Sequence, residues 1–131
     1  IELLPLGVKV IDLSADFRLR DPAVYRQWYG TDHAAPELLK EAVYALPEVY
    51  RQQLTTARLA AVPGCYPTAV LLGLLPLFKR EIIDPNSLVI DAISGASGAG
   101  RKLDLPLHFA ELEGNVKAYK VACHRHMPEI E

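Results

Sequence analysis

Residues 58–78, RLAAVPGCYPTAVLLGLLPLF, decide the fold of this chain. The run 58–62 predicts a buried β-strand, which the Pro63-Gly64 pair interrupts. The run 69–78 is apolar nearly all round, so it predicts a helix that is buried rather than amphipathic. A strand that turns directly into a helix favours an architecture in which strands and helices alternate.

Further strands and helices are predicted on both sides of this unit. The additional strands are short β-branched runs at residues 8–13, 87–93 and 116–122. A helix with Asp21 as its N-cap is predicted to end at Gly30, and a second helix is predicted to begin at Pro36 and end before Pro47. Strands that alternate with helices indicate an α/β to α+β fold.

The composition describes a chain that can build one hydrophobic core. Half of its 131 residues are hydrophobic and 23% are charged, unlike a disordered segment. The net charge of −2 leaves no excess of Lys and Arg for a phosphate backbone or an anionic membrane, so we expect neither as a partner. The longest apolar stretch, 68–78, is shorter than the roughly 20 residues that cross a bilayer. Two cysteines are too few for a secreted disulfide framework, so we expect a reducing cytoplasm.

The two ends of the chain suggest a segment of a longer protein. The sequence begins at Ile1 without an initiator Met and stops at Glu131, directly after the stretch that contains the two neighbouring histidines, His124 and His126. We therefore expect the activity to belong to a longer parent protein, and the isolated 131 residues to be inactive.

Cys65 is the strongest candidate for a nucleophile. It lies between a predicted strand and a helix expected to begin at Pro67. Unpaired N–H groups and the positive end of the helix dipole favour a thiolate at such a place. The alternative is a buried cysteine that behaves as a small hydrophobic residue.

His124 and His126 lie two residues apart, so on a strand both would point to one face. One of them could serve Cys65 as general acid and base. Together with Cys123 they contain the atom types of a zinc site, but no further ligand pair completes four, so we expect no metal. Hydrogen-bonded structural histidines are the third possibility.

Two other segments carry candidate binding residues. The serine- and glycine-rich stretch 94–100 offers free backbone N–H groups that could approach a phosphate or a cofactor, and Arg101 beside it suits a phosphate or carboxylate. The stretch fits neither the Walker A loop nor the Rossmann fingerprint. Asp16 and Arg18 follow the first predicted strand and could line a site or pair with each other at the surface.

Four motifs in this order resemble the N-acetyl-gamma-glutamyl-phosphate reductase family, within the semialdehyde dehydrogenase superfamily. They are VIDLSADFR at 10–18, PGCYPTA at 63–69, SGASGAGR at 94–101 and HRHMPEIE at 124–131. The resemblance covers essentially the whole chain. The second and fourth motifs are specific to this family and its lysine-pathway relatives.

The resemblance implies a role for each candidate. Cys65 would be the nucleophile and His124 the acid/base, with His126 as a second candidate or substrate contact. The residues implied at the NADPH site are Ser94, Gly95, Ser97, Gly98 and Asp16. The residues implied at the substrate are Arg101, His126 and Arg18.

The resemblance also implies an incomplete two-domain arrangement. Residues 1–86 would be the end of a Rossmann-like cofactor-binding domain, with the cysteine loop and the buried helix. Residues 87–131 would begin a catalytic domain similar to that of glyceraldehyde-3-phosphate dehydrogenase. The full-length protein would be a homo-oligomer.

The implied activity is NADPH-dependent reduction of N-acetyl-gamma-glutamyl phosphate to the semialdehyde and phosphate, through a cysteinyl thioester, in arginine biosynthesis. A carrier-protein-linked lysine-pathway reductase and an enzyme like aspartate-semialdehyde dehydrogenase are alternatives within the same chemistry. A Cys/His hydrolase and an inactive structural or dimerisation segment are alternatives of other classes.

Overall fold

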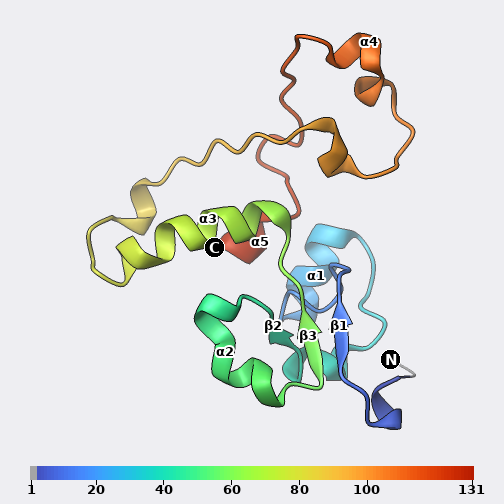
Figure 1. The fold of residues 1–131 in the computed structure, drawn as a ribbon, viewed down its shortest axis with the longest axis vertical. Helices are drawn as coiled ribbons and strands as arrows, with labels where there is room; N and C mark the ends of the chain where they lie inside the picture. The colour runs from blue at the N-terminus through green and yellow to red at the C-terminus, as the bar shows by residue number, and fades with distance from the viewer. Residues whose placement is uncertain (1–2) are drawn as a thin grey trace.

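The computed structural model describes residues 3–131 and is centred on a parallel sheet (Figure 1). Its three strands, β1 (Val10–Asp12), β2 (Val43–Tyr44) and β3 (Leu59–Ala61), lie in the order β1-β3-β2. Val10 lies opposite Leu59, and Val43 opposite Ala60. Because the strands are parallel, their carboxyl ends meet at one edge of the sheet, where ligands bind in open α/β folds.

Helices and 3-10 turns precede, connect and follow the strands. They are η1 (Leu4–Leu6), α1 (Pro22–Tyr29), η2 (Pro36–Lys40), α2 (Pro47–Thr56) and α3 (Cys65–Phe78). Local signals fix both ends of α1: the Asp21 carboxylate accepts a hydrogen bond from the Ala23 N–H at 2.7 Å, and Gly30 ends the helix with a φ of 72°.

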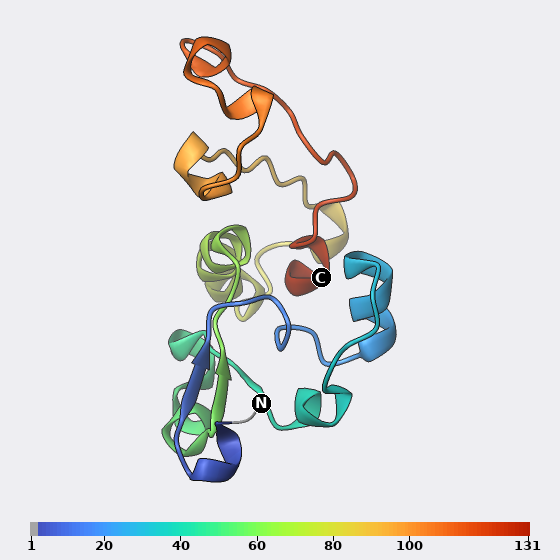
Figure 2. The ribbon, with the colours of Figure 1, turned by 90° about the vertical axis from the view of Figure 1, so that its right-hand side faces the viewer.

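The second half of the chain leaves the sheet and then returns to it. Its short elements are η3 (Pro85–Ser87), η4 (Ala96–Ala99), η5 (Leu105–Leu107), α4 (Phe109–Leu112) and α5 (Met127–Ile130). Figures 1 and 2 show η4, η5 and α4 in an extended lobe away from the sheet. The chain then comes back, and α5 packs against α3.

The core lies in the first half of the chain. Leu4, Ala42 and Leu59 form its buried cluster. The partly buried side chains packed against that cluster are Val10, Phe17 and Leu38. The sheet therefore rests on a small core, and its carboxyl edge is left for the loops and α5.

Several predicted elements are confirmed. The predicted strands 8–13 and 58–62 correspond to β1 and β3, and the helix capped by Asp21 corresponds to α1. The mixed α/β fold class is confirmed as well. In each case the deciding signals are close together in the sequence.

The predicted strands 87–93 and 116–122 are wrong. Both segments are irregular, and they pair with none of the described strands. Val89 and Val116 are 88% and 82% exposed, so neither segment packs on a core. β-branched residues favour a strand only where a neighbouring strand takes up the backbone hydrogen bonds.

The helix predictions need four corrections. The segment that begins at Pro36 is a 3-10 helix followed by β2, and α2 was not predicted. α3 begins at Cys65 rather than at Pro67, because Pro lacks only an N–H that the first turn does not use. α3 is also not buried: Pro67 is its one buried residue, since α5 is the main element packed on it.

Leu59→Ala is expected to lower the free energy of unfolding of the 131-residue chain by about 2–5 kcal/mol, because the Leu59 side chain fills the core and is 1% exposed. Leu6, which is 71% exposed, provides the control, and Leu6→Ala should change that free energy by less than about 0.5 kcal/mol. Urea denaturation followed by circular dichroism measures both. Equal losses would contradict this core.

Candidate active site

A single carboxylate near the end of the chain joins the carboxyl ends of the strands. Glu129, in α5, has a fully buried side chain. Its Oε1 accepts from Arg18 Nη1 at 3.3 Å, and its Oε2 accepts from the Tyr44 hydroxyl at 3.1 Å and from the Gly64 N–H at 3.0 Å. We call Arg18, Tyr44, Gly64 and Glu129 the strand-end cluster.

Arg18 extends this cluster across the sheet. Its Nε donates to the Val62 carbonyl at 2.7 Å and its Nη2 to the Leu13 carbonyl at 3.3 Å. The side chain is 10% exposed. The guanidinium thus joins the residues after β1 and β3 to Glu129, and in this structure it pairs with Glu129 rather than with Asp16. Its predicted substrate contact stays a prediction.

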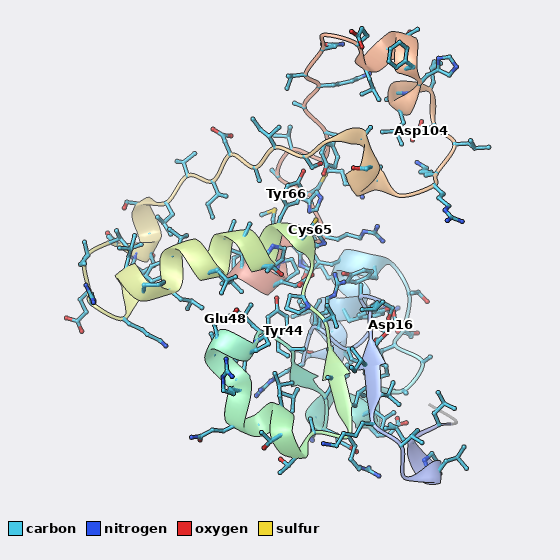
Figure 3. The ribbon with its side chains drawn as sticks, in the orientation of Figure 1. Asp16, Tyr44, Glu48, Cys65, Tyr66 and Asp104 are labelled. Atoms are coloured by element: carbon cyan, nitrogen blue, oxygen red, sulfur yellow. The ribbon has the colours of Figure 1, made fainter. Side chains whose placement is uncertain are left out.

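Cys65 is the first residue of α3 and is exposed (Figure 3). Gly64, the N-cap, accepts at its carbonyl from the Thr68 N–H at 3.0 Å and from the Thr68 hydroxyl at 2.8 Å. These bonds close the first turn of the helix. Pro67 has no N–H, so the N–H groups of Cys65 and Tyr66 are those left in the first turn to stabilise negative charge on a sulfur or an oxyanion.

The two histidines meet at this turn, although the strand predicted to carry them does not form. The rings of His124 and His126 lie 4.7 Å apart, and the ring of Tyr66 lies edge-on to both, at 5.3 and 5.8 Å. The His126 ring lies directly on Gly64, so that no Cβ fits there. The histidine pair is therefore next to the residues that flank Cys65.

Burial lowers the pKa of both histidines. The His126 N–H donates to Nδ1 of His124 at 3.1 Å, which leaves the proton of a neutral His124 ring on Nε2. Nδ1 of His126 is buried and has no hydrogen-bond partner among residues 3–131. Both rings are therefore favoured in the neutral form.

Tyr119 is a site residue that sequence reasoning missed. Its hydroxyl donates to the Tyr66 hydroxyl at 3.0 Å and lies 3.4 Å from Nε2 of His124. The hydrogen bond to Tyr66 is the main cause that raises the pKa of Tyr119 to about 12, and burial adds to it. Tyr119 is therefore a neutral phenol beside the histidine.

The serine- and glycine-rich stretch lies near the same residues only at its beginning. Ser94 is close enough to Tyr119 to influence its pKa. Residues 95–100, which include Gly95, Ser97 and Gly98, are exposed and contain η4. Arg101 is exposed and takes part in none of the ion pairs of residues 3–131. The structure thus brings Ser94 to the site and leaves Arg101 in solvent.

Asp16 follows β1 but has structural partners. Its carboxylate accepts from the Tyr25 hydroxyl at 2.9 Å, and its carbonyl lies 2.8 Å from Nε2 of His33. Burial, and then this bond to Asp16, raise the pKa of Tyr25 to about 12. The implied cofactor contact of Asp16 stays a prediction.

Neither a metal centre nor a membrane span is found in the described part of the chain. No group of three or more His, Cys, Asp or Glu side chains among residues 3–131 is arranged to hold a metal ion. None of the helices in that range has both the length and the apolar character that a membrane crossing requires.

Two family models match the chain in succession. Residues 2–57 match the semialdehyde dehydrogenase NAD binding domain, and residues 65–131 match the semialdehyde dehydrogenase dimerisation domain. The site lies where the two matches meet, because Cys65 begins the second. The expected succession of a cofactor domain and a second domain is confirmed.

Curated relatives are similar over almost the whole chain. N-acetyl-gamma-glutamyl-phosphate reductase of Nitrosococcus oceani is 59% identical over 128 residues, which is 98% of this chain and 37% of the relative. The reductases of the same name from Laribacter hongkongensis and Desulforudis audaxviator are 57% and 58% identical over 130 residues, 99% of this chain and 38% of each relative. The predicted resemblance is confirmed. The chain spans less than two fifths of these relatives.

Gly64→Ala is expected to lower the free energy of unfolding by about 1–3 kcal/mol, because the added methyl group would lie 2.7 Å from Cδ2 of His126. The φ of Gly64 is −65°, so alanine adds no left-handed strain, and the contact with His126 is the main cost beside the smaller preference for glycine over alanine at an N-cap. Gly73→Ala in the same helix is the control. It meets nothing within 4 Å and should stabilise by about 0.4–1 kcal/mol.

Urea denaturation of both variants measures the difference. A Gly64→Ala variant as stable as Gly73→Ala would mean that the His126 ring does not lie on Gly64.

Proposed function

Because this chain belongs to the semialdehyde dehydrogenase family, we propose that it supplies the nucleophile and the acid/base of an enzyme that reduces N-acetyl-gamma-glutamyl phosphate with NADPH. The observation that carries the proposal is the histidine pair on the turn that presents Cys65 at a helix N-terminus. The names of the similar reductases support the substrate.

The first step is the attack of the Cys65 thiolate on the carbonyl carbon of the acyl phosphate. The new C–S bond gives a thioester, and the C–O bond to phosphate breaks and releases inorganic phosphate. First-turn N–H groups of α3 stabilise the oxyanion of the tetrahedral intermediate. The neutral form of His124 or His126, favoured by the lowered pKa of each, can take the thiol proton beforehand.

The second step reduces the thioester. NADPH, when bound, supplies a hydride to the thioester carbonyl. The protonated histidine gives its proton to the resulting oxyanion. The histidine takes that proton back as the hemithioacetal collapses, so that the semialdehyde leaves and Cys65 returns as a thiolate. His124 is our assignment for this acid/base: it would take the thiol proton at Nδ1, in place of the hydrogen bond that this atom accepts from the His126 N–H, while Nε2 keeps its contact with the Tyr119 hydroxyl.

The binding residues follow the same proposal. The exposed backbone of 94–100 fits a nicotinamide or phosphate contact, with Ser94, Gly95, Ser97 and Gly98 at the cofactor, because its first residue lies beside Tyr119. Asp16 lies after β1, at the edge of a parallel sheet where dinucleotides bind.

The substrate contacts we propose are Arg101, whose guanidinium is exposed, His126 and Arg18. Arg18 would contact the substrate while its guanidinium stays hydrogen-bonded to Glu129 and to the carbonyls of Val62 and Leu13.

The parent protein is proposed to be a cytoplasmic homo-oligomer in arginine biosynthesis. The dimerisation-domain match supports an oligomer, and two free cysteines suit a reducing compartment. We propose that the cofactor domain ends at residue 86 and that the catalytic domain begins at residue 87.

Cys65→Ser in the full-length protein is expected to abolish NADPH oxidation with the acyl phosphate and to leave NADPH binding unchanged, because serine lacks a nucleophilic thiolate. Cys123→Ser is the matched control, since Cys123 is also free and exposed, and it should retain activity. Absorbance at the nicotinamide band measures turnover. Turnover in the Cys65→Ser protein would exclude the covalent route, and acid release without NADPH oxidation in the unaltered protein would indicate a hydrolase.

His124→Asn is expected to lower kcat/KM by about 10²- to 10⁴-fold, the usual contribution of a general acid/base. Since burial lowers the pKa of His124, the limb of the pH–kcat/KM profile should lie below the ordinary histidine value of about 6.5, and the variant should lose it. His126→Asn is the comparison and should keep this limb. Small and equal losses would mean that neither histidine is the acid/base.

A further inference from the structure

We propose that Glu129 is a positioning residue, which holds the segment 124–129 against the Cys65 turn through the strand-end cluster. This inference rests on the proposed function, because it concerns the same site. In this role the buried carboxylate of Glu129 keeps the acid/base aligned with the nucleophile.

Glu129 bonds to three different parts of the chain. Its carboxylate contacts Arg18 after β1, Tyr44 at the end of β2 and Gly64 after β3, while its own backbone belongs to α5. Its side chain has no solvent exposure. A carboxylate buried to this extent requires all of these donors, so α5 has one docked position on the sheet edge.

The same residue of the Cys65 turn receives both Glu129 and His126. The Gly64 N–H donates to Oε2 of Glu129 at 3.0 Å, and the His126 ring covers the Cα of Gly64. His126 and Glu129 are three residues apart, the spacing that places two side chains on one face of a helical turn. Holding Glu129 therefore holds the histidine segment on the residue that precedes Cys65.

A second contact helps to orient the segment 124–129. The guanidinium of Arg125 lies over the ring of Tyr29, 5.4 Å from its centroid. Arg125 thus binds α1 while the histidines on either side of it face Tyr66.

The bond to Gly64 distinguishes positioning from stability alone. Stability alone would be served by any further donor to the second oxygen of Glu129, and buried ion pairs contribute little net stability compared with apolar residues of the same volume. Here the second carboxylate oxygen, Oε2 of Glu129, accepts a hydrogen bond from Gly64, the residue before the nucleophile. Burial, and then the charge of Glu129, raise the pKa of Tyr44, so its hydroxyl stays a donor to this oxygen.

The test uses Glu129→Gln in the full-length protein, with Glu131→Gln as the control, because Glu131 is exposed two residues away. The readout is kcat divided by the fraction of Cys65 thiols that iodoacetamide alkylates, which mass spectrometry of the Cys65 peptide quantifies. KM is measured for NADPH and for the acyl phosphate. Glu129→Gln should lower this normalised kcat by about 10- to 100-fold with KM changed less than about 2-fold, since loss of alignment costs rate rather than binding. Glu131→Gln should match the unaltered protein.

Tyr44→Phe keeps the test decisive if Glu129→Gln does not fold. It removes one hydrogen bond and leaves the Arg18–Glu129 pair, so a loss of about 2- to 10-fold in normalised kcat is expected. A normalised kcat unchanged in every folded variant, while the unaltered protein reduces the acyl phosphate, overturns the positioning role and leaves the proposed function standing. An unaltered protein that alkylates at Cys65 but oxidises no NADPH overturns the proposed function instead.

Discussion

The buried pairing of Arg18 with Glu129 is the interaction on which the arrangement of this site depends. Removing two charges from water costs several kcal/mol for each ion, and the pair persists only when further hydrogen bonds complete it. The Tyr44 hydroxyl, the Gly64 N–H and two strand-end carbonyls supply those bonds. Each donor or acceptor comes from a different place on the carboxyl edge of the sheet, so the pair forms only when that edge is assembled.

This constraint brings together residues that are distant in the sequence. Cys65 lies at the start of a helix that follows β3, whereas His124 lies almost sixty positions later, after an extended lobe with little core of its own. The lobe does not fix where the chain returns. The contacts of Glu129 do so, and the close approach of His126 to Gly64 explains why glycine precedes the cysteine.

Sequence reasoning succeeded where the deciding signals are local. Asp21 and Gly30 cap α1, and the step from β3 to α3 follows from an apolar run ended by Pro-Gly. It failed for 87–93 and 116–122, because a strand depends on a partner strand that the sequence of the segment cannot reveal. Residue type alone suggested His124 or His126 as a partner of Cys65, and the choice of His124 came from the resemblance. Glu129 was missed because a carboxylate in a short helix resembles a surface residue, although its place in the HRHMPEIE motif was an available signal.

A double-mutant cycle on the free energy of unfolding of the 131-residue chain tests the central pairing most directly. Arg18→Met and Glu129→Met should each cost about 3–5 kcal/mol, because each leaves an uncompensated buried charge. The double variant should cost less than the sum by at least about 2 kcal/mol, since the two residues interact directly. Losses that add to within about 0.5 kcal/mol would show that the two side chains do not pair, and would contradict this account of the site.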